Sequence, residues 1–272
     1  MSSEHPDLVI ENPAHLRVDR PSPGVVLITL DNPTQRNAMS DEMTRSWVAA
    51  VEELKGDESV RCVVVTGAGS AFSSGGNVSW LAGHGESTVP ALRDGMLAFY
   101  RAWLTIRELE VPTIAAINGH AIGAGLCIAM ACDLRFASSA AKLGAPFVKL
   151  GIHPGMASTF LFPDVVGEAI ARDLLLTGRL VEGEEAQRLG LVSRVLPPEE
   201  LLATALAAAA EIAATAPLAS RFTKVALQRR HASIEDCLQW EAMAQPVTLA
   251  TEDLQEGIQA VLEKRDPRFS GR

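Results

Sequence analysis

The sequence predicts an α/β protein in which short, buried strands alternate with helices and a helical region follows them. Three observations lead to this prediction. β-Branched runs at 61–66 and 113–118 are typical of strands that are buried on both faces. Glycine-rich turns end these runs, and segments with helical spacing follow the turns. From Pro198 onward the sequence predicts helix almost to its end, with breaks near Pro217 and Ser233.

Turn and cap residues define the first elements. Strands are expected at 15–20 and 25–30, because the Pro-Ser-Pro-Gly segment between them is a turn signal. Ser40 can cap the helix that follows, and the acidic first turn of that helix suits the positive end of the helix dipole. The apolar face of this helix consists of Met43, Trp47, Val51 and Leu54.

The order of strand, strand and helix then recurs along the chain, which indicates structural repetition even though no clean sequence repeat is present. A further strand is expected at 134–137. Further helices are expected at 91–109, 124–132, 165–178 and 182–190.

Composition restricts the classes of function. The chain has 272 residues, of which 47% are hydrophobic and 21% charged, so a sizeable core is expected and global disorder is not. The net charge of −9 and the lack of any lysine- or arginine-rich run argue against nucleic acid or an anionic membrane as partner. The histidine spacing matches no metal motif, and no phosphate-loop or dinucleotide motif occurs, so neither a metal nor a resident cofactor is expected.

Cysteine usage predicts a reducing compartment. None of the four cysteines forms a C-x-x-C pair, and several lie in apolar runs where a thiol acts as a small hydrophobe. The first six residues are polar and lack the apolar core of a signal peptide. We therefore expect a cytoplasmic protein without disulfides.

Two glycine-rich turns are the strongest chemical signal. Ser73-Ser74-Gly75-Gly76 and Gly123-Ala124-Gly125 each follow a strand and precede a helix. Glycine lets backbone approach a ligand closely, and a helix N-terminus presents free N–H groups. Together the turns suit the binding of an oxyanion, such as an enolate. A single turn of this kind more often serves only tight packing.

Short motifs occur in a fixed order along most of the chain. They are 37–39, 63–67, 71–77, 112–121, 123–133, 150–155, 176–178, 186–192 and 263–265 with Phe269. This set, which extends from about residue 15 to 270, resembles the enoyl-CoA hydratase/isomerase (crotonase) family. The resemblance implies a spiral of repeated β-β-α units with C-terminal trimerisation helices. It also implies a spiral core over 1–197 and a helical oligomerisation region over 198–272.

The same resemblance implies an acyl-coenzyme A (acyl-CoA) thioester as substrate and a homotrimer or homohexamer as assembly. The backbone N–H groups of Ser74 and Ala124 would form the oxyanion hole. The family often has aspartate where this chain has Asn77, and Lys264 could meet a CoA phosphate on a neighbouring subunit. The residues implied to contact the CoA ester are Arg36, Asn37, Ala38, Ser74, Gly75, Gly76, Asn77, Ala124 and Lys264.

The chain departs from the family at two catalytic positions. Hydratases of this family use two glutamates to place and activate a water, and the aligned residues here are Cys127 and Phe147. Phe147 has no proton to exchange, and no neighbour of Cys127 in sequence would lower the pKa of its thiol. The acid–base residues of any reaction are therefore atypical.

Replacement acids or bases are open to several interpretations. Tyr100, the only tyrosine, lies on the helix expected at 91–109 and is either an acid–base group or a core residue. The other titratable residues considered, each of which has an ordinary structural or solvated interpretation, are His84, Asp94, Glu108, His120 and His153.

Three functions fit this sequence. The first is an enzyme, a lyase or isomerase of the enoyl-CoA hydratase/isomerase type, that acts on acyl-CoA through an oxyanion. The second is an acyl-CoA sensor or carrier that has lost its acid–base pair. The third is a structural subunit of a larger lipid-processing assembly. We favour the first, with an apolar acyl pocket beside Phe147.

The missing carboxylates predict slow hydration. General acid–base catalysis raises a rate by about 10²–10⁴-fold. This protein should therefore hydrate crotonyl-CoA more slowly, by about that factor, than a hydratase that has both glutamates. A coupled assay on crotonyl-CoA measures this rate. Turnover at ordinary hydratase rates would contradict the prediction.

Overall fold

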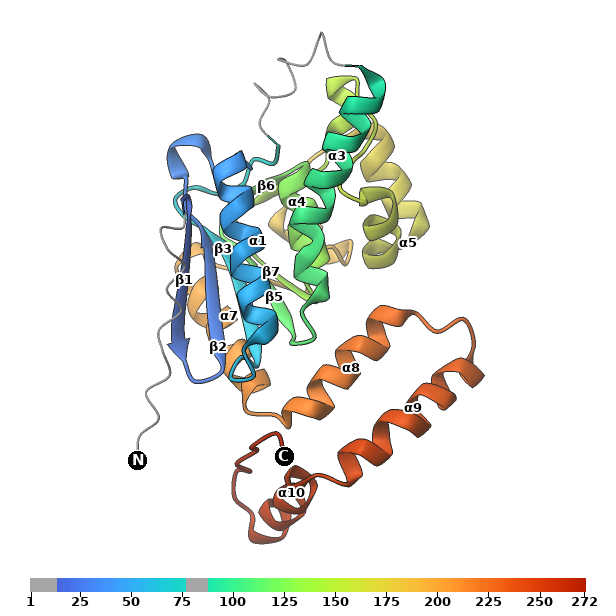
Figure 1. Ribbon diagram of the computed structural model, residues 1–272. Coiled ribbons are helices and arrows are strands. Elements are labelled where there is room, and N and C mark those ends of the chain that lie inside the picture. The colour runs from blue at the N-terminus through green and yellow to red at the C-terminus, as the bar shows by residue number, and fades with distance from the viewer. Residues whose placement is uncertain (1–13, 77–87) are drawn as a thin grey trace.

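The computed structural model describes residues 14–76 and 88–272, and a six-stranded sheet lies at its centre (Figure 1). β1 and β2 form an antiparallel hairpin around the predicted turn, and the remaining neighbours pair in parallel. The strands, in spatial order, are β1 (Leu16–Ser22), β2 (Val25–Leu30), β3 (Cys62–Gly67), β5 (Thr113–Ile117), β7 (Leu134–Ser138) and β10 (Arg194–Leu196). β2, β3 and β5 are buried along their whole length, as their β-branched runs predict.

A second sheet is built from four short strands. They are β4 (Ala71–Ser73), β6 (His120–Ile122), β8 (Lys142–Gly144) and β9 (Val181–Glu182). Each of β3, β5 and β7 in the large sheet is followed by a short strand of the second sheet and then by a helix. This order confirms the predicted spiral of strand–strand–helix units. The sequence did not locate the short strands, because two or three residues show too little periodicity.

Helices cover one face of the large sheet and form the main core. Ser40 caps α1 by accepting a hydrogen bond from the Met43 N–H, as expected. Trp47 of α1 stacks on Trp103 of α3 with ring centroids 5.0 Å apart. The elements on this side are α1 (Asp41–Gly56), α3 (Val89–Leu104), α4 (Ala124–Ala131), α5 (Ser158–Thr177) and α6 (Gly183–Arg188), with 3₁₀ turns at Pro33–Gln35, Thr105–Glu108 and Phe147–Leu150.

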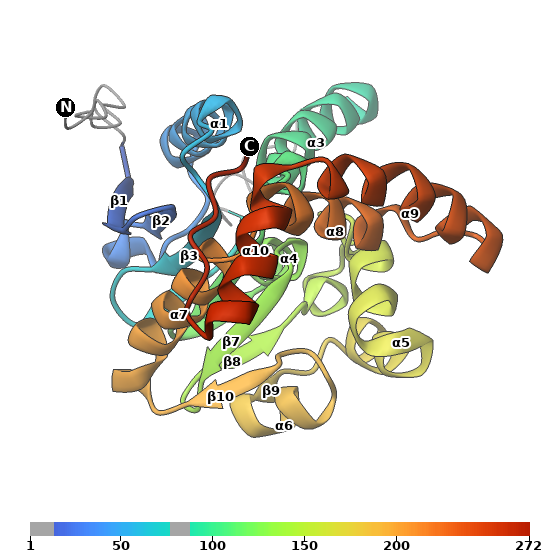
Figure 2. The ribbon, with the colours of Figure 1, turned by 90° about the horizontal axis from the view of Figure 1, so that it is seen from below.

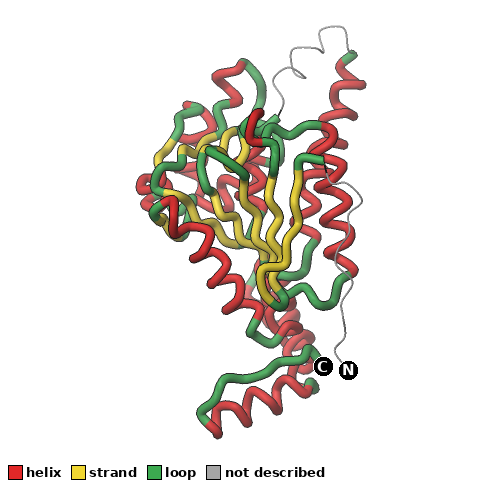
Figure 3. The backbone as a smooth tube through the Cα atoms, turned by 90° about the vertical axis from the view of Figure 1, so that its left-hand side faces the viewer, coloured by secondary structure: helices red, strands yellow, loops and turns green. Residues whose placement is uncertain are grey.

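Helix α7 (Pro198–Ala213) covers the opposite face of the large sheet (Figures 2 and 3). Its small side chains, among them Ala205 and Ala209, are buried in a second core against Val64 and Ile114. The alanine-rich composition therefore allows a close approach of the helix to the strands. The packed core thus continues through α7, beyond the boundary at residue 197 that the sequence suggested.

The last three helices project from the body of the molecule (Figure 1). They are α8 (Pro217–Arg229), α9 (Ile234–Leu249) and α10 (Glu252–Glu263). The sequence missed the break between α9 and α10. Their exposed apolar side chains include Leu227, Ile234, Met243, Val261 and Leu262. Among the described helices none alone is long and apolar enough to span a membrane; α7 and α8 qualify only as a pair that is bent by 110°.

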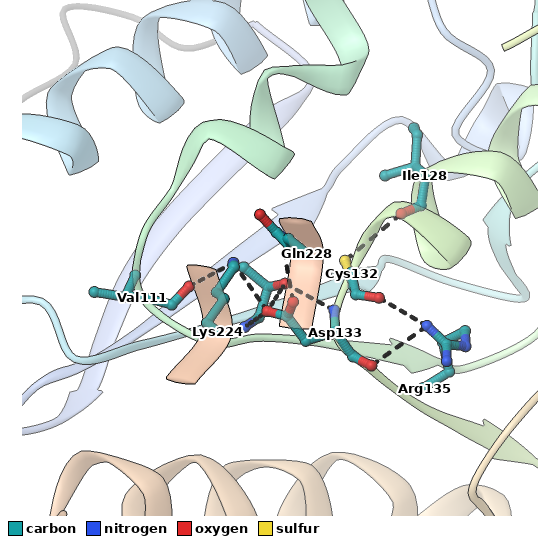
Figure 4. A network of polar contacts seen from close by, with 8 residues as sticks. Val111, Ile128, Cys132, Asp133, Arg135, Lys224 and Gln228 are labelled. Carbon is teal, nitrogen blue, oxygen red and sulfur yellow. Dashed lines mark hydrogen bonds and ion pairs between the residues drawn. The ribbon is translucent and has the colours of Figure 1, made fainter. Parts of the chain in front are cut away.

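A buried ion pair anchors α8 to the sheet (Figure 4). Lys224 of α8 is 5% exposed, and its Nζ lies 2.9 Å from Oδ2 of Asp133 and donates to the Val111 carbonyl at 2.7 Å. The same Oδ2 accepts hydrogen bonds from the backbone N–H and the hydroxyl of Thr113. Because each buried polar group has a partner, the pair fixes the position of α8 without an unpaired charge.

Removal of one partner should destabilise the fold. Lys224→Met keeps the side-chain volume but leaves the half-buried Asp133 carboxylate without its cation, so we expect a loss of about 2–3 kcal/mol in the free energy of unfolding. Denaturant titration measures this loss. As the matched control, Lys142→Met breaks the exposed pair with Glu182 and should change stability by less than about 0.5 kcal/mol. Equal losses of stability in the two variants would contradict the role of Lys224 as the anchor of α8.

Candidate functional site

A mostly apolar cavity of about 460 Å³ lies where the first turn of α1, the 74–76 loop, α3 and the start of α4 meet. The segment between β8 and α5 closes its remaining side. The lining residues are Met39, Ser40, Asp41, Glu42, Ser74, Gly76, Met96, Phe99, Tyr100, Ile122, Gly123, Ala124, Pro146, Phe147, Lys149, Leu150, Ile152, His153, Gly155 and Met156. Its size suits an acyl group with part of its carrier.

The two glycine-rich turns are in direct contact at this cavity. Gly75 has a φ of +85°, and a Cβ atom there would lie 2.5 Å from the Ile122 carbonyl oxygen and 3.1 Å from the Ala124 nitrogen. A Cβ on Gly125 would in turn lie 2.4 Å from the Ser73 carbonyl oxygen. Only glycine fits at both positions. The structure therefore brings Ser74 and Ala124 to one cavity.

The two N–H groups differ in their hydrogen bonding. Ala124 is the first residue of α4, and its N–H donates to no residue of 14–76 or 88–272, so it is available to a ligand at the positive end of the helix. The Ser74 N–H donates to the Arg36 carbonyl at 2.9 Å. A ligand oxygen at Ser74 would have to share or replace that bond, at a cost of about 1 kcal/mol.

The structure places Asn37, one of the predicted CoA contacts, in the protein interior. Its side chain is fully buried, and its Nδ2 donates to the carbonyls of Ala68 and Ala71 at 2.9 and 2.8 Å. Its Oδ1 accepts from the Asn32 N–H. Asn37 cannot contact a ligand, because these bonds use its amide to hold the loop before α1 against β4. The prediction of ligand contact was wrong for this residue.

The other predicted CoA contacts differ in their position relative to the cavity. Arg36 is exposed and Ala38 half-buried, and neither lines the cavity. Gly75 is buried, whereas its neighbour Gly76 lines the cavity. Lys264 directly follows α10, and this helix lies at the opposite end of the molecule from α3 and β6 (Figure 1). Asn77 lies outside the described residues.

Cys127 and Phe147, which the resemblance aligns with the two glutamates of the hydratases, bring no carboxylate to the cavity. Cys127 is fully buried and does not line the cavity, and burial raises the pKa of its thiol to about 12. A raised thiol pKa means that Cys127 is neutral at any pH well below 12. The Phe147 ring lines the cavity, and a Cβ on Gly123 would lie 3.7 Å from it. This ring makes the wall beside Ala124 apolar.

Tyr100 supplies a polar group to the cavity wall. It is half-buried on α3 and its ring meets the Phe99 ring edge to face, with centroids 6.2 Å apart. Burial, with a smaller contribution from nearby Cys127, raises the pKa of the Tyr100 phenol. A phenol with a raised pKa stays protonated at neutral pH and can donate a hydrogen bond.

The remaining titratable residues sort into two groups. His153 lines the cavity, as do Asp41, Glu42 and Lys149, which the sequence did not single out. The sequence could have identified Asp41 and Glu42, because both directly follow Ser40, the residue that caps α1. Asp94 pairs with Arg93, Glu108 pairs with Lys55, and neither lines the cavity; nor does exposed His120. His84 falls in the segment that the structure does not describe.

No group of three or more histidine, cysteine, aspartate or glutamate side chains within residues 14–76 and 88–272 could hold a metal ion. The polar side chains at the described cavity are three hydroxyls, one imidazole and three charged groups: Ser40, Ser74, Tyr100, His153, Asp41, Glu42 and Lys149. Such a set suits an organic ligand with one anionic oxygen.

Comparison with known proteins places the chain among acyl-CoA enzymes. A family model described as enoyl-CoA hydratase/isomerase matches residues 20–272. A candidate enoyl-CoA hydratase of Thermus thermophilus is 41% identical over 246 residues, which are 90% of this chain and 97% of that protein. The short-chain-enoyl-CoA hydratase of Clostridium acetobutylicum is 35% identical over 243 residues, 89% of this chain and 92% of that protein.

A solved structure gives the same result. The crystal structure of an enoyl-CoA hydratase from Bacillus anthracis superimposes with a TM-score of 0.90 at 33% sequence identity. The match covers 95% of this chain and 100% of that chain. The crotonase-type fold that the motifs implied is thereby confirmed.

The burial of Cys127 predicts an unreactive thiol. Cys62, Cys127 and Cys132 are buried with pKa values raised to about 12, whereas Cys237 is partly exposed. At pH 8 a chromogenic disulfide reagent should therefore label at most one thiol per native chain, and all four after denaturation. A second fast thiol that is lost in Cys127→Ser would show that Cys127 is accessible and reactive.

Proposed function

Because this chain belongs to the enoyl-CoA hydratase/isomerase family, we propose that it binds an acyl-CoA thioester and stabilises the enolate oxygen with backbone amides. The Ala124 N–H is the primary donor, and the Ser74 N–H the second. The observation that carries the proposal is the contact of the two glycine turns at one cavity, with the Gly75 backbone against the Ala124 nitrogen. Preorganised donors of this kind gain strength in an apolar pocket.

The acid–base chemistry is proposed to differ from two-glutamate hydration. A buried neutral thiol and a phenyl ring stand at the glutamate positions, so a water has no carboxylate at either position to activate it. Tyr100 is the candidate proton donor, because the raised pKa favours its protonated form. Asp41 and Glu42 at the cavity wall are candidate bases. These groups fit a lyase or isomerase reaction on the α and β carbons.

The acyl group is proposed to be larger or more apolar than a short enoyl chain. Met39 and Met156 are buried in the cavity wall, and Met96 and Phe147 contribute further apolar surface. Methionine side chains adapt to irregular ligands because they are unbranched and flexible. The apolar wall beside Phe147 disfavours a bound water.

We also propose CoA-phosphate contacts, an oligomeric state and a location for the protein. Exposed Arg36 and, from a neighbouring subunit, Lys264 are candidates to bind CoA phosphates. The apolar side chains exposed on α8, α9 and α10 suit burial between copies in a homotrimer or homohexamer. The protein is proposed to act in the cytoplasm on a small-molecule thioester, without nucleic acid or membrane and without a resident cofactor.

The second candidate is an acyl-CoA sensor or carrier. The replacement of both glutamates favours this alternative, because binding by the amides needs no acid–base pair. Calorimetric titration with acyl-CoA esters beside a turnover panel separates the candidates. Tight binding without turnover would favour the sensor or carrier, and no binding at all would favour a structural role.

Removal of one amide tests the oxyanion site. Ala124 is the first residue of α4, where proline is tolerated, so Ala124→Pro deletes the N–H and keeps the helix start. We expect kcat on the best substrate to fall about 10²–10³-fold. Ala124→Gly keeps the N–H and is the matched control, with a much smaller loss. A loss of equal size in both variants would assign the effect to packing and contradict the oxyanion role.

A further inference from the structure

Ser73 is a fully buried serine at the end of β4, directly before the loop that carries the proposed donor Ser74. Its hydroxyl donates to the Asn37 carbonyl at 2.8 Å and accepts from the Gly75 N–H at 3.1 Å. A buried hydroxyl is unfavourable unless it is hydrogen-bonded, and alanine would fill nearly the same space without that cost. A hydroxyl that is bonded in both directions at this point indicates a role other than packing.

The bond from the Gly75 N–H to the Ser73 hydroxyl closes a tight turn around Ser74. A serine oxygen that accepts from the N–H two residues later fixes the backbone between the two residues. Ser74 is the residue between them, so this turn sets the direction of the Ser74 N–H. Ser73 also lies against the start of α4, because a Cβ on Gly125 would be 2.8 Å from the Ser73 Cβ. One side chain thus borders both halves of the proposed oxyanion site.

The acceptor of the Ser73 hydroxyl belongs to a strained stretch of backbone. Arg36 and Asn37 both adopt left-handed conformations, with φ of 52° and 53°, although neither is glycine. In these conformations the Asn37 carbonyl accepts from the Ser73 hydroxyl, and the Arg36 carbonyl accepts from the Ser74 N–H at 2.9 Å. The buried Asn37 amide holds this backbone in place by donating to two carbonyls of the segment that joins β3 to β4. Strained backbone persists only where surrounding contacts fix it, so the acceptor has a defined position.

We infer that Ser73 is a positioning residue for the oxyanion site. Its hydroxyl, held by the Asn37 carbonyl, keeps the backbone of Ser74 and Gly75 in the orientation that binds the thioester oxygen beside α4. The inference rests on the proposed acyl-CoA function and adds a residue that does not line the cavity and acts only through the loop. Loss of the hydroxyl should therefore weaken the stabilisation of the enolate more than the binding of a neutral ester.

Acetoacetyl-CoA tests this inference with the full-length chain, because this ester ionises to an enolate that absorbs in the near ultraviolet. Oxyanion donors favour the ionised form, so the ratio of enolate to neutral ester at a fixed pH should be higher on the unaltered protein than in buffer. In Ser73→Ala this ratio should fall about tenfold, as the loss of one neutral hydrogen bond allows. The Kd of butyryl-CoA, which stays neutral, should change much less. An unchanged enolate ratio in Ser73→Ala overturns the inference.

Ser138→Ala is the matched control. Ser138 is a fully buried serine at the end of β7, and its hydroxyl also accepts from the N–H two residues later. It lies beside β10 and the start of α6 and does not line the cavity. In denaturant titration the two variants should lose similar stability, whereas only Ser73→Ala should lower the enolate ratio. Equal falls of the ratio in both variants would assign the effect to a general loosening of the fold and overturn the inference.

Ser73→Cys gives a second readout at the same position. A thiol is a weaker donor and acceptor than a hydroxyl, so the enolate ratio should lie between those of the unaltered protein and Ser73→Ala. A lower ratio in Ser73→Cys than in Ser73→Ala would assign the effect to packing and overturn the inference. If acetoacetyl-CoA does not bind, or binds with the ratio found in buffer, the proposed oxyanion site fails as well. A raised ratio that is equal in the unaltered protein and Ser73→Ala overturns only the role of Ser73.

Discussion

The close contact of two glycine turns is the constraint on which the site depends. Gly75 and Gly125 let the 74–76 loop and the start of α4 pack backbone against backbone, where any side chain would force them apart. The surrounding spiral supports this contact, because β4 and β6 pair in parallel just before the two turns. The fold therefore positions peptide N–H groups at the cavity, and the side chains around them can vary.

Local signals allowed much of this architecture to be predicted from the sequence. The Ser40 cap, the strands β2, β3 and β5 and the glycine turns each depend on residues close together in the chain, and they form where expected. Predictions that depend on distant segments were less complete. The Asn37 amide turns inward because carbonyls more than thirty residues away accept from it, which sequence spacing does not reveal.

In the site, too, features that depend on neighbouring residues were predicted, and features that depend on distant segments were not. The two amide positions follow from motifs, but the Ser74–Arg36 hydrogen bond and the place of Tyr100 against Gly155 depend on how separate elements pack. The burial of α7 was also not foreseen, because alanine-rich helices occur both in cores and on surfaces. The resemblance to the family directed attention to Cys127 and Phe147, whereas the presence of Asp41, Glu42 and Lys149 at the cavity became apparent only in three dimensions.

Helix α4 joins the amide site to the anchor of the C-terminal helices. All eight of its residues are buried; Ala124 begins it, and Asp133, which holds Lys224, follows it by two residues. A helix of this length is about 12 Å long and acts as a short stiff rod. We therefore expect a displacement of α8 that shifts Lys224 to alter the position of the Ala124 N–H, the proposed oxyanion donor. Contacts made by the three C-terminal helices would in this way affect the site through a single helix.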